Sequence, residues 1–324
     1  MGDVLYAVTD EGLSLPVVDV THPAFAVAAT DAELAAMSDQ YLREATLRQE
    51  VPATVREALQ RSMLGRGLMA ASGTILTGMN TYLLKLGPDN LGTGASPIDH
   101  RIAASLPAFA SRLRLQDVAR LLADGLTVLL AAASQRPLCF INIAGGPAAD
   151  SWNALIHLRA EHSELLDERK ILVAVLDRDD HGPAFGGRAI HSLRASEAPL
   201  SGLDIRFHHV EYNWSEADRL QEALDDLGAS HAVCAISSEG GLFEYGSDTE
   251  ILGNLRVLHH GTASDAIVVG SVTRDGELVR AQGVGAATQP RTLEAFQALA
   301  EETGWIVQRV IERPFSYNVR LVKD

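Results

Sequence analysis

From residue 137 onward, short apolar runs alternate with amphipathic segments. The runs predict strands and the segments between them predict helices. Because the runs are apolar almost throughout, both faces of the sheet should be covered, which is typical of a parallel sheet between two layers of helices. The expected strands are residues 138–144, 170–177, 205–212, 231–237 and 265–273. The expected helices between them begin near Ser151, Phe185, Ser215 and Asp248.

The end of the chain follows a different pattern. A helical segment that starts at residue 292 ends at Gly304, and two strand-like runs, 305–312 and 319–324, flank a short polar turn. Two strands joined in this way form an antiparallel hairpin at the sheet edge. We therefore predict a doubly wound, mostly parallel seven-stranded α/β sheet that ends in an antiparallel hairpin. A nicotinamide-binding Rossmann domain would more naturally end in a sixth parallel strand, and is disfavoured.

Residues 1–136 differ from the remainder. After two β-like runs, at 4–9 and 13–20, apolar residues recur at three- and four-residue spacing over 31–50 and 52–72. We interpret residues 1–136 as a mainly helical cap or dimerisation region. Residues 137–324 would then form a Rossmann-like domain.

Composition narrows the class of partner. Lys and Arg total 27 against 42 Asp and Glu, a net charge of −15, which argues against nucleic acid and anionic membrane surfaces as partners. Cys139 and Cys234 both lie in apolar runs, so we expect buried thiols. No secretory leader pattern and no apolar stretch of membrane-spanning length occur, so we expect a cytoplasmic protein.

The histidines do not suggest a metal site. His259 and His260 come just before a strand, at a helix end where cations are favourable. His208 and His209 are neighbours in one strand, so their side chains point to opposite faces. No H-x-x-x-H spacing occurs, and we expect no metal.

The stretch INIAGGPAAD, residues 141–150, follows the first strand of the expected sheet. Ligands of an open α/β sheet bind outside the carboxyl ends of its strands. Small residues here would let a ligand approach the backbone, and the next helix would offer free N–H groups and a positive dipole end. The alternative is a tight strand–helix turn capped by Asp150.

Polar residues after the next two strands suit a nucleoside. Asp177 ends the second strand, where a carboxylate can accept both hydroxyls of a ribose. After the third strand, Asn213 can bond an adenine edge and Trp214 offers an apolar ring face. Alternatively, Arg178 belongs to a solvated turn, Trp214 lies at the edge of the core, and Asn213 caps the next helix.

Together these features resemble the class I S-adenosylmethionine (SAM)-dependent methyltransferases, over roughly residues 137–324. The resemblance includes the segment ISSEGG after the fourth strand and the terminal hairpin. The first turn departs from the family pattern of an acidic residue followed by three alternating glycines. Asn142 replaces the acidic residue, Ala144 and Ala148 replace the outer glycines, and Gly146 remains.

The resemblance implies SAM as the cofactor. Backbone groups around Ala144, Gly145 and Gly146 would hold the methionine, Asp177 would bind the ribose, and Asn213 and Trp214 would border the adenine. The other expected cofactor-binding residues are Pro147, Arg178, Ser237 and Ser238.

The loop SSEGGLFEYGSD, residues 237–248, supplies the catalytic candidates Glu239, Glu244 and Tyr245, and its acidity suits an amine-bearing acceptor. The alternative is a solvated loop whose Asp248 caps the next helix. Weaker acceptor-side candidates are Tyr82, Asp99, His100 and Arg101.

The leading hypothesis is a small-molecule methyltransferase that acts on an O, N or C acceptor by in-line displacement, as a homodimer through its N-terminal helices. Two alternatives remain open. The protein could bind the cofactor but catalyse a different reaction, or it could be a non-enzymatic scaffold or dimerisation protein.

Overall fold

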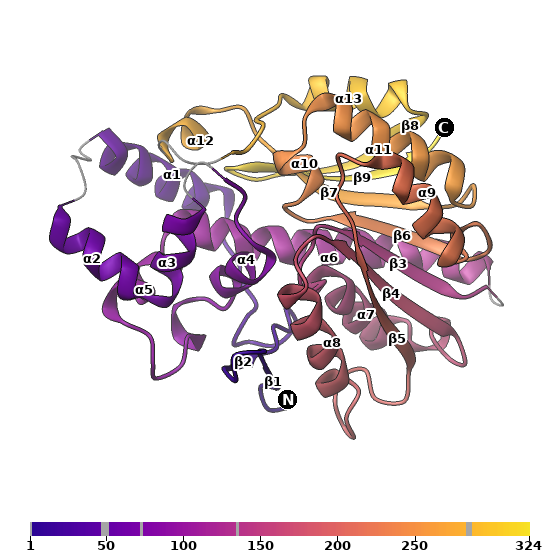
Figure 1. Ribbon diagram of the computed structural model, residues 1–324, viewed down its shortest axis with the longest axis horizontal. Helices are drawn as coiled ribbons and strands as arrows, with labels where there is room; N and C mark the ends of the chain where they lie inside the picture. Colours follow the sequence, from indigo (N-terminus) through magenta and orange to yellow (C-terminus); the bar gives the residue numbers. More distant parts are fainter. Residues whose placement is uncertain (1, 47–51, 72–73, 134–135, 283–286) are drawn as a thin grey trace.

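The protein is described by a computed structural model over residues 2–46, 52–71, 74–133, 136–282 and 287–324 (Figure 1). Its centre is a seven-stranded sheet of order β5-β4-β3-β6-β7-β9-β8. All neighbours from β5 to β7 are parallel, and β9 is antiparallel to both β7 and β8. The strands are β3 (Leu138–Ile143), β4 (Lys170–Asp177), β5 (Asp204–Glu211), β6 (Val233–Ser238), β7 (Ile267–Thr273), β8 (Trp305–Glu312) and β9 (Ser316–Lys323).

The sheet confirms the predicted fold class, with one difference in the hairpin. Strand β9 begins at Ser316, three residues before the start expected from the sequence. The backbone N–H of Arg313 donates to the carbonyl of Ser316 at 2.8 Å and closes a tighter turn. The polar residues after it pair with β7, and Asn318 is fully buried because its amide donates to Asp117 at 2.9 Å.

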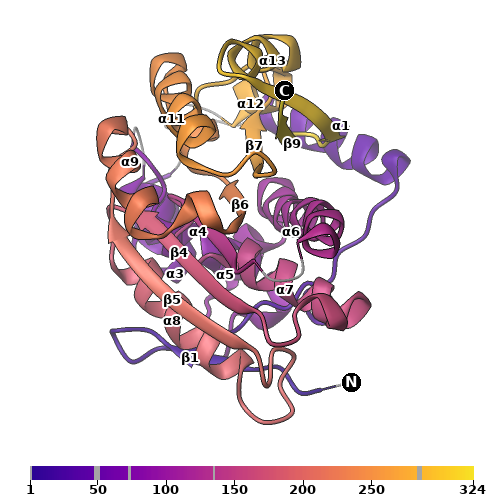
Figure 2. The ribbon, with the colours of Figure 1, turned by 90° about the vertical axis from the view of Figure 1, so that its right-hand side faces the viewer.

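Alternation along the strands produces two hydrophobic cores, one on each face. Helices lie on both faces of the sheet (Figure 2). On one face Phe140 and Val173 pack with α6, α7 and α8. On the other, Ile141 and Leu176 pack with α9, α11 and α13. The helices that cover the sheet are α6 (Leu106–Ala132), α7 (Ala149–Glu161), α8 (His181–Leu193), α9 (Ala217–Asp226), α11 (Asp248–Gly261) and α13 (Leu293–Glu302).

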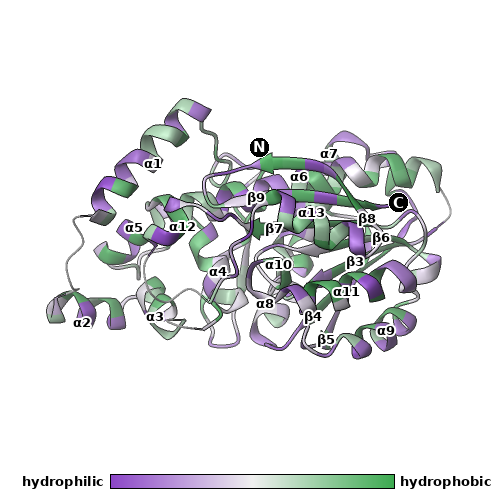
Figure 3. Cartoon of the chain, turned by 90° about the horizontal axis from the view of Figure 1, so that it is seen from above, coloured by the Kyte–Doolittle hydropathy of each residue, from purple (hydrophilic) through white to green (hydrophobic). Residues whose placement is uncertain are grey.

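The N-terminal region is mainly helical, as predicted. It contains a small hairpin, β1 (Tyr6–Val8) with β2 (Ser14–Pro16), and then α1 (Asp31–Thr46), α2 (Ala53–Arg61), α3 (Met63–Ala70), α4 (Gly78–Lys85) and α5 (Pro97–Ala103). Helices α1 and α2 extend away from the sheet, and their surfaces mix apolar and polar residues (Figure 3). No residue of α2 is buried.

This region shares a core with the sheet. Tyr82 of α4 contacts the rings of Trp152 and Phe185. Trp152 donates its indole N–H to the carbonyl of Val18 at 2.8 Å. Within the described ranges, no helix is long and apolar enough to cross a membrane.

Candidate functional site

The turn after β3 has an unusual backbone. Ala144, Gly146 and Ala148 have φ angles of 54°, 55° and 63°. These three residues are in left-handed conformations. They occupy the positions at which the methyltransferase family that the chain resembles has glycine. An alanine in this region costs about 1 kcal/mol relative to a right-handed conformation. The turn therefore keeps the shape of a glycine turn although two of its glycines are replaced.

Asp177 holds this turn from the end of β4. Its Oδ2 accepts the backbone N–H of Gly146 and its Oδ1 accepts that of Asp179, both at 3.0 Å. Burial raises the pKa of the carboxyl, and these two hydrogen bonds partly offset the shift. Each oxygen keeps a second lone pair, so the carboxylate can still accept a hydroxyl.

Backbone from elsewhere in the chain covers the turn. A Cβ on Gly78, the first residue of α4, would lie 2.5 Å from Cα of Gly146. A Cβ on Gly182 of α8 would lie 2.8 Å from the same atom. Gly146 is consequently buried. On the β6 side, a Cβ on Gly241 would lie 2.8 Å from Cβ of Ala144.

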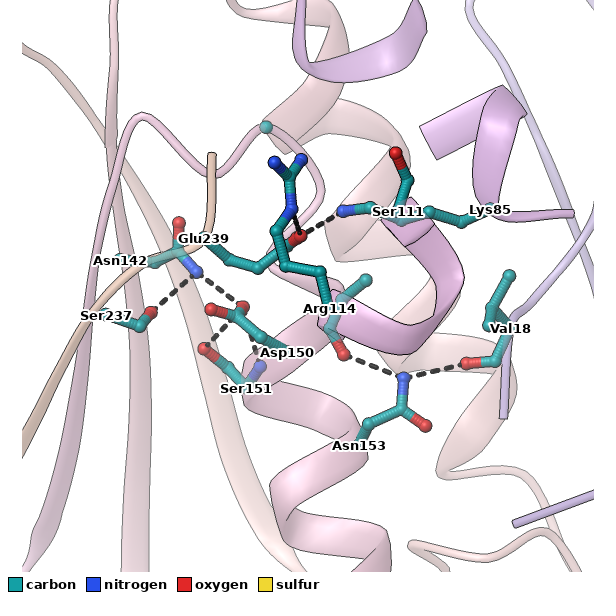
Figure 4. Close-up of polar contacts among 12 residues, drawn as sticks. Val18, Lys85, Ser111, Arg114, Asn142, Asp150, Ser151, Asn153, Ser237 and Glu239 are labelled. Carbon is teal, nitrogen blue, oxygen red and sulfur yellow. Dashed lines mark hydrogen bonds and ion pairs between the residues drawn. The ribbon is translucent and has the colours of Figure 1, made fainter. Parts of the chain in front are cut away.

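A buried polar cluster lies beneath the turn (Figure 4). The amide nitrogen of Asn142 donates to Asp150 at 2.6 Å and to Ser237 at 2.9 Å. Burial and the nearby Glu239 raise the pKa of Asp150 to about 6. Oδ1 of Asn142 and Oδ2 of Asp150 are buried without a hydrogen-bond partner among the described residues. The side chain of Asn142 thus links Asp150 to Ser237 beneath the turn.

Ion pairs next to this cluster join the N-terminal region to the loop after β6. Oε1 of Glu239 accepts from Nε of Arg114 at 2.7 Å, and Oε2 pairs with the ammonium of Lys85 (Figure 4). The other side of Arg114 reaches Glu244 at 3.1 Å. The side chains of Lys85 and Glu239 are 5% and 3% exposed, so this is a desolvated pair. Both oxygens of Glu239 are engaged, which leaves it poorly suited to act as a base.

A cavity of about 780 Å³ lies between the N-terminal helices, the carboxyl end of β7 and α10 (Leu242–Tyr245). This volume suits a drug-sized ligand. The charged side chains that line it are Arg101, Arg114 and Glu244, and Tyr245 adds a hydroxyl. Its apolar walls include Leu59, Leu68, Leu84, Ile102, Ala108 and Phe315.

Of the sequence candidates, Glu244, Tyr245 and Arg101 line this cavity. Burial and the charge of Glu244 raise the pKa of Tyr245, so its hydroxyl stays protonated at neutral pH. Burial raises the pKa of Glu244, and Arg114 lowers it. Asp177, Asn213 and Trp214 lie outside the cavity.

Other candidates have structural partners. Oδ1 of Asn213 accepts the N–H of Ser215 at 3.2 Å, and Trp214 packs at the edge of the second core. The hydroxyls of Ser237 and Ser238 are buried. Arg178 and the backbone at Gly145 stay accessible at this edge, whereas Pro147 is buried. Trp214 therefore lies at the edge of the core, as the structural alternative has it. Asn213 bonds the following turn but does not cap α9, which begins after Glu216.

Three of the weaker acceptor-side candidates also have structural partners. Asp99 accepts the N–H groups of Ser96 and Leu64 and forms a capping box. Tyr82 is buried, and His100 bonds the carbonyl of Pro88. Helix α11 begins with Ser247 as its cap, one residue before the expected Asp248. His259 and His260 end α11, as expected.

One group of possible metal ligands occurs among the described residues. Ligand atoms of Asp179, Asp180 and His181 lie within 4.8 Å of one another. Asp180 and His181 are exposed, and His181 pairs with Asp10 at 3.2 Å. Exposed acidic groups of this kind are common at protein surfaces, and we assign no metal to them.

Sequence reasoning found Arg101 but missed three other site residues of the N-terminal region, Gly78, Lys85 and Arg114. Lys85 and Arg114 are 154 and 125 positions from Glu239. Gly78 likewise lies far along the chain from Gly146, in the turn that it covers. Each occurs within a helical pattern with no local feature that distinguishes it from its neighbours. Only the tertiary structure brings them to the strand ends.

Compared with protein-family models and with curated proteins, the sequence gives no match. Among solved structures, the chain is similar to a possible exported protein from Bordetella parapertussis, with a TM-score of 0.59 and 18% identity over 91% of this chain and 97% of that one. It is also similar to the mitomycin 7-O-methyltransferase MmcR, with a TM-score of 0.41 and 12% identity over 87% and 75% of the two chains. A third similar structure is the pyocyanin biosynthetic protein PhzM, with a TM-score of 0.43 and 15% identity over 91% of this chain and 74% of that one.

The strand topology defines the fold, and the similarity with a TM-score of 0.59 agrees with it. The strand order, with β9 reversed between β7 and β8, is that of the class I SAM-dependent methyltransferases. The chain therefore has the class I methyltransferase fold, preceded by a helical N-terminal region.

Proposed function

We propose that this protein is a SAM-dependent small-molecule methyltransferase, and that the 780 Å³ cavity receives the acceptor. The observation that carries the proposal is the backbone of the first turn. Ala144 and Ala148 adopt left-handed conformations that alanine disfavours, at the positions of the family's glycines. Local strain of this kind persists where the surrounding structure maintains it, often at functional sites.

The fit of the cofactor differs between its two ends. At the ribose position, Asp177 has free acceptor capacity beside the turn. At the methionine position, the backbone of Gly78 lies against Gly146, so the conformation described leaves no room for a ligand there. The residues suit the nucleoside end, while the methionine end is closed by the chain itself.

When bound, SAM supplies a methyl group that needs no activation, and the protein contributes alignment and exclusion of water. Tyr245, with its raised pKa, would donate a hydrogen bond to the acceptor rather than remove its proton. Glu244 is the remaining candidate for a base, held in place by Arg114. Glu239 would position Arg114 and Lys85.

The charges of the cavity favour one class of acceptor. The loop after β6 loses its acidic character because Lys85 and Arg114 neutralise Glu239 and Glu244. Arg101 is exposed and has no ion-pair partner among the described residues. A neutral or anionic acceptor with an apolar body therefore suits the cavity better than the amine-bearing acceptor expected from the sequence.

The test is binding followed by turnover. Purified full-length protein is titrated with SAM and with its demethylated product by calorimetry, and labelled SAM is then supplied with a panel of hydroxylated aromatic acids and amines. We expect both cofactor forms to bind, and label to pass to the acids and phenols first. Absence of binding would remove the proposal.

The closed methionine end favours a second candidate. A methyltransferase-fold protein that uses the cavity to bind a small molecule, without methyl transfer, fits the contact between Gly78 and Gly146 equally well. Ligand-dependent thermal stabilisation by members of the acceptor panel, with no effect of SAM, would favour this candidate.

Two further expectations belong to the proposal. The homodimer would form through the N-terminal helices, where α2 has no buried residue and Val55 is 40% exposed. Sedimentation analysis of the wild-type chain and of Val55→Glu tests this. The cytoplasmic location stays a prediction, which fractionation of the native host checks.

A further inference from the structure

The segment from Leu76 to Gly78 lies between the two compartments of the site. Leu76 lines the 780 Å³ cavity, and two residues later Gly78 lies against the turn at Gly146. The chain therefore passes directly from the wall of the cavity to the place where a cofactor would contact the turn.

The contact at Gly78 requires two glycines. A Cβ on Gly78 would lie 2.5 Å from Cα of Gly146, and a Cβ on Gly146 would lie 2.6 Å from Cα of Gly78. Distances below 3.0 Å do not occur for real Cβ atoms, and the atoms met here are backbone, which cannot rotate away. Neither position can carry a side chain while the contact is present.

The other end of the segment lies beside the loop after β6. Burial raises the pKa of the Tyr245 hydroxyl and the nearby backbone of Leu76 partly offsets this shift, and both residues line the cavity. Residues 76–78 therefore lie between the loop after β6 and the turn after β3.

The remainder of α4 is firmly anchored. The hydroxyl of Tyr82 donates to the carbonyl of Pro16 at 2.7 Å and accepts the N–H of Val18 at 2.9 Å. Lys85 at the end of the helix pairs with the buried Glu239. Residues 76–77 and the first turn of α4 take part in none of these contacts, so they can leave Gly146 without disrupting them.

We propose that residues 76–78 form a gate between the cavity and the turn after β3, and that the structure describes its closed state. With the gate closed, a ligand in the cavity and a ligand on the turn are separated by polypeptide. With the gate open, the two compartments join and the side of Gly146 that Gly78 covers becomes accessible, while Gly182 still lies against the other side. The inference rests on the proposed function for the identity of the ligand, but the gate itself can be tested without it.

Gly78→Ala tests the gate, because the added methyl group excludes the closed contact. The matched control is Gly94→Ala, where a Cβ meets nothing within 4 Å and φ is not left-handed. Without competition from the closed state, we expect Gly78→Ala to bind the demethylated cofactor roughly tenfold more tightly than wild type, and Gly94→Ala to match wild type. Equal affinities for all three proteins would overturn the gate.

A second readout separates the gate from the methyltransferase proposal. Hydrogen exchange of the backbone amides at 76–80 and 144–148 is measured without ligand. The gate predicts faster exchange in Gly78→Ala at both segments and no change in Gly94→Ala. Unchanged exchange would overturn the gate, whereas faster exchange with no cofactor binding by any variant would support the gate and refute the proposed function.

Tyr245→Phe serves if Gly78→Ala fails to fold, as judged by circular dichroism. It removes the hydroxyl that lies near the backbone of Leu76 and leaves the ring in place. We expect it to speed exchange at the same two segments. Slow exchange identical to that of wild type would overturn the proposal.

Discussion

The backbone N–H of Gly146 donates a 3.0 Å hydrogen bond to Oδ2 of Asp177, which fastens the turn after β3 to the end of β4. This bond joins the two elements on which a nucleoside would rest. It also gives Asp177 a role in the folded protein that does not depend on any ligand.

Replacing Asp177 tests its structural role in the turn and its proposed role in cofactor binding by two separate measurements. Asp177→Ala leaves the N–H groups of Gly146 and Asp179 without their acceptor, so we expect a loss of about 2 kcal/mol in the free energy of unfolding. Cofactor affinity should fall more than tenfold. Denaturant titration and calorimetry measure the two effects, with the exposed Asp180→Ala as the control. Undiminished cofactor affinity would place the ribose elsewhere.

Restoring a glycine should relieve the strained turn. Ala148 has a φ of 63°, so Ala148→Gly removes a left-handed alanine at the cost of a more flexible unfolded chain. We expect Ala148→Gly to be close to neutral, because the relief of about 1 kcal/mol of strain is offset by the flexible unfolded chain and by the loss of a buried methyl group. Ala154→Gly, within helix α7, should instead destabilise by about 1 kcal/mol. If both variants lose the same stability in denaturant, the turn is not strained.

The buried ion cluster should be sensitive to loss of one carboxylate. Glu239→Gln leaves Lys85 and Arg114 in a desolvated site without full neutralisation. Breaking such a pair costs about 3–5 kcal/mol. Glu244 is more exposed, and Glu244→Gln leaves Arg114 paired with Glu239. We therefore expect Glu244→Gln to lower the free energy of unfolding by less than about half as much as Glu239→Gln. Thermal unfolding compares the two, and equal losses would contradict the argument.

Asp150 should make stability depend on pH. Its pKa is raised from 3.8 to about 6, so between these values the folded protein holds a proton that the unfolded chain releases. Stability from this group is therefore full below pH 4 and decreases as the pH rises to about 6, by on the order of 3 kcal/mol.

The variant Asp150→Asn removes this dependence while its amide oxygen still accepts from Asn142. Between about pH 4.5 and pH 7.5, the melting temperature of the variant should therefore rise relative to that of wild type. Asp204→Asn, at an exposed position of β5 without an ion-pair partner among the described residues, should give a constant difference over this range. A constant difference for Asp150→Asn as well would show that its pKa is ordinary.

The fold could be predicted from sequence because its determinants are local. Continuous apolar strands such as 170–177 indicate a sheet that is buried on both faces. The change of pattern after residue 304 indicates the antiparallel hairpin at the end of the sheet. The start of β9 was missed because Ser316 and Asn318 are polar, and only their bonding partners across the sheet make burial favourable.

The site was predicted only in part, for the same reason. Asp177 and the turn follow from the rule that ligands bind at strand ends. The closure by Gly78 and the neutralisation of Glu239 by Lys85 depend on contacts between segments far apart in the chain. Such contacts leave no periodicity in the sequence.

The carbonyl of Val18 accepts hydrogen bonds from the indole of Trp152 at 2.8 Å and from the amide of Asn153 at 2.9 Å. During synthesis on the ribosome, the first segment of the chain must therefore wait until α7 has left the exit tunnel before its polar groups are satisfied. Release of residues 1–136 alone would leave apolar surface of α4 and α6 exposed. The two regions are expected to complete folding together, which makes early chain termination a route to aggregation rather than to a stable N-terminal fragment.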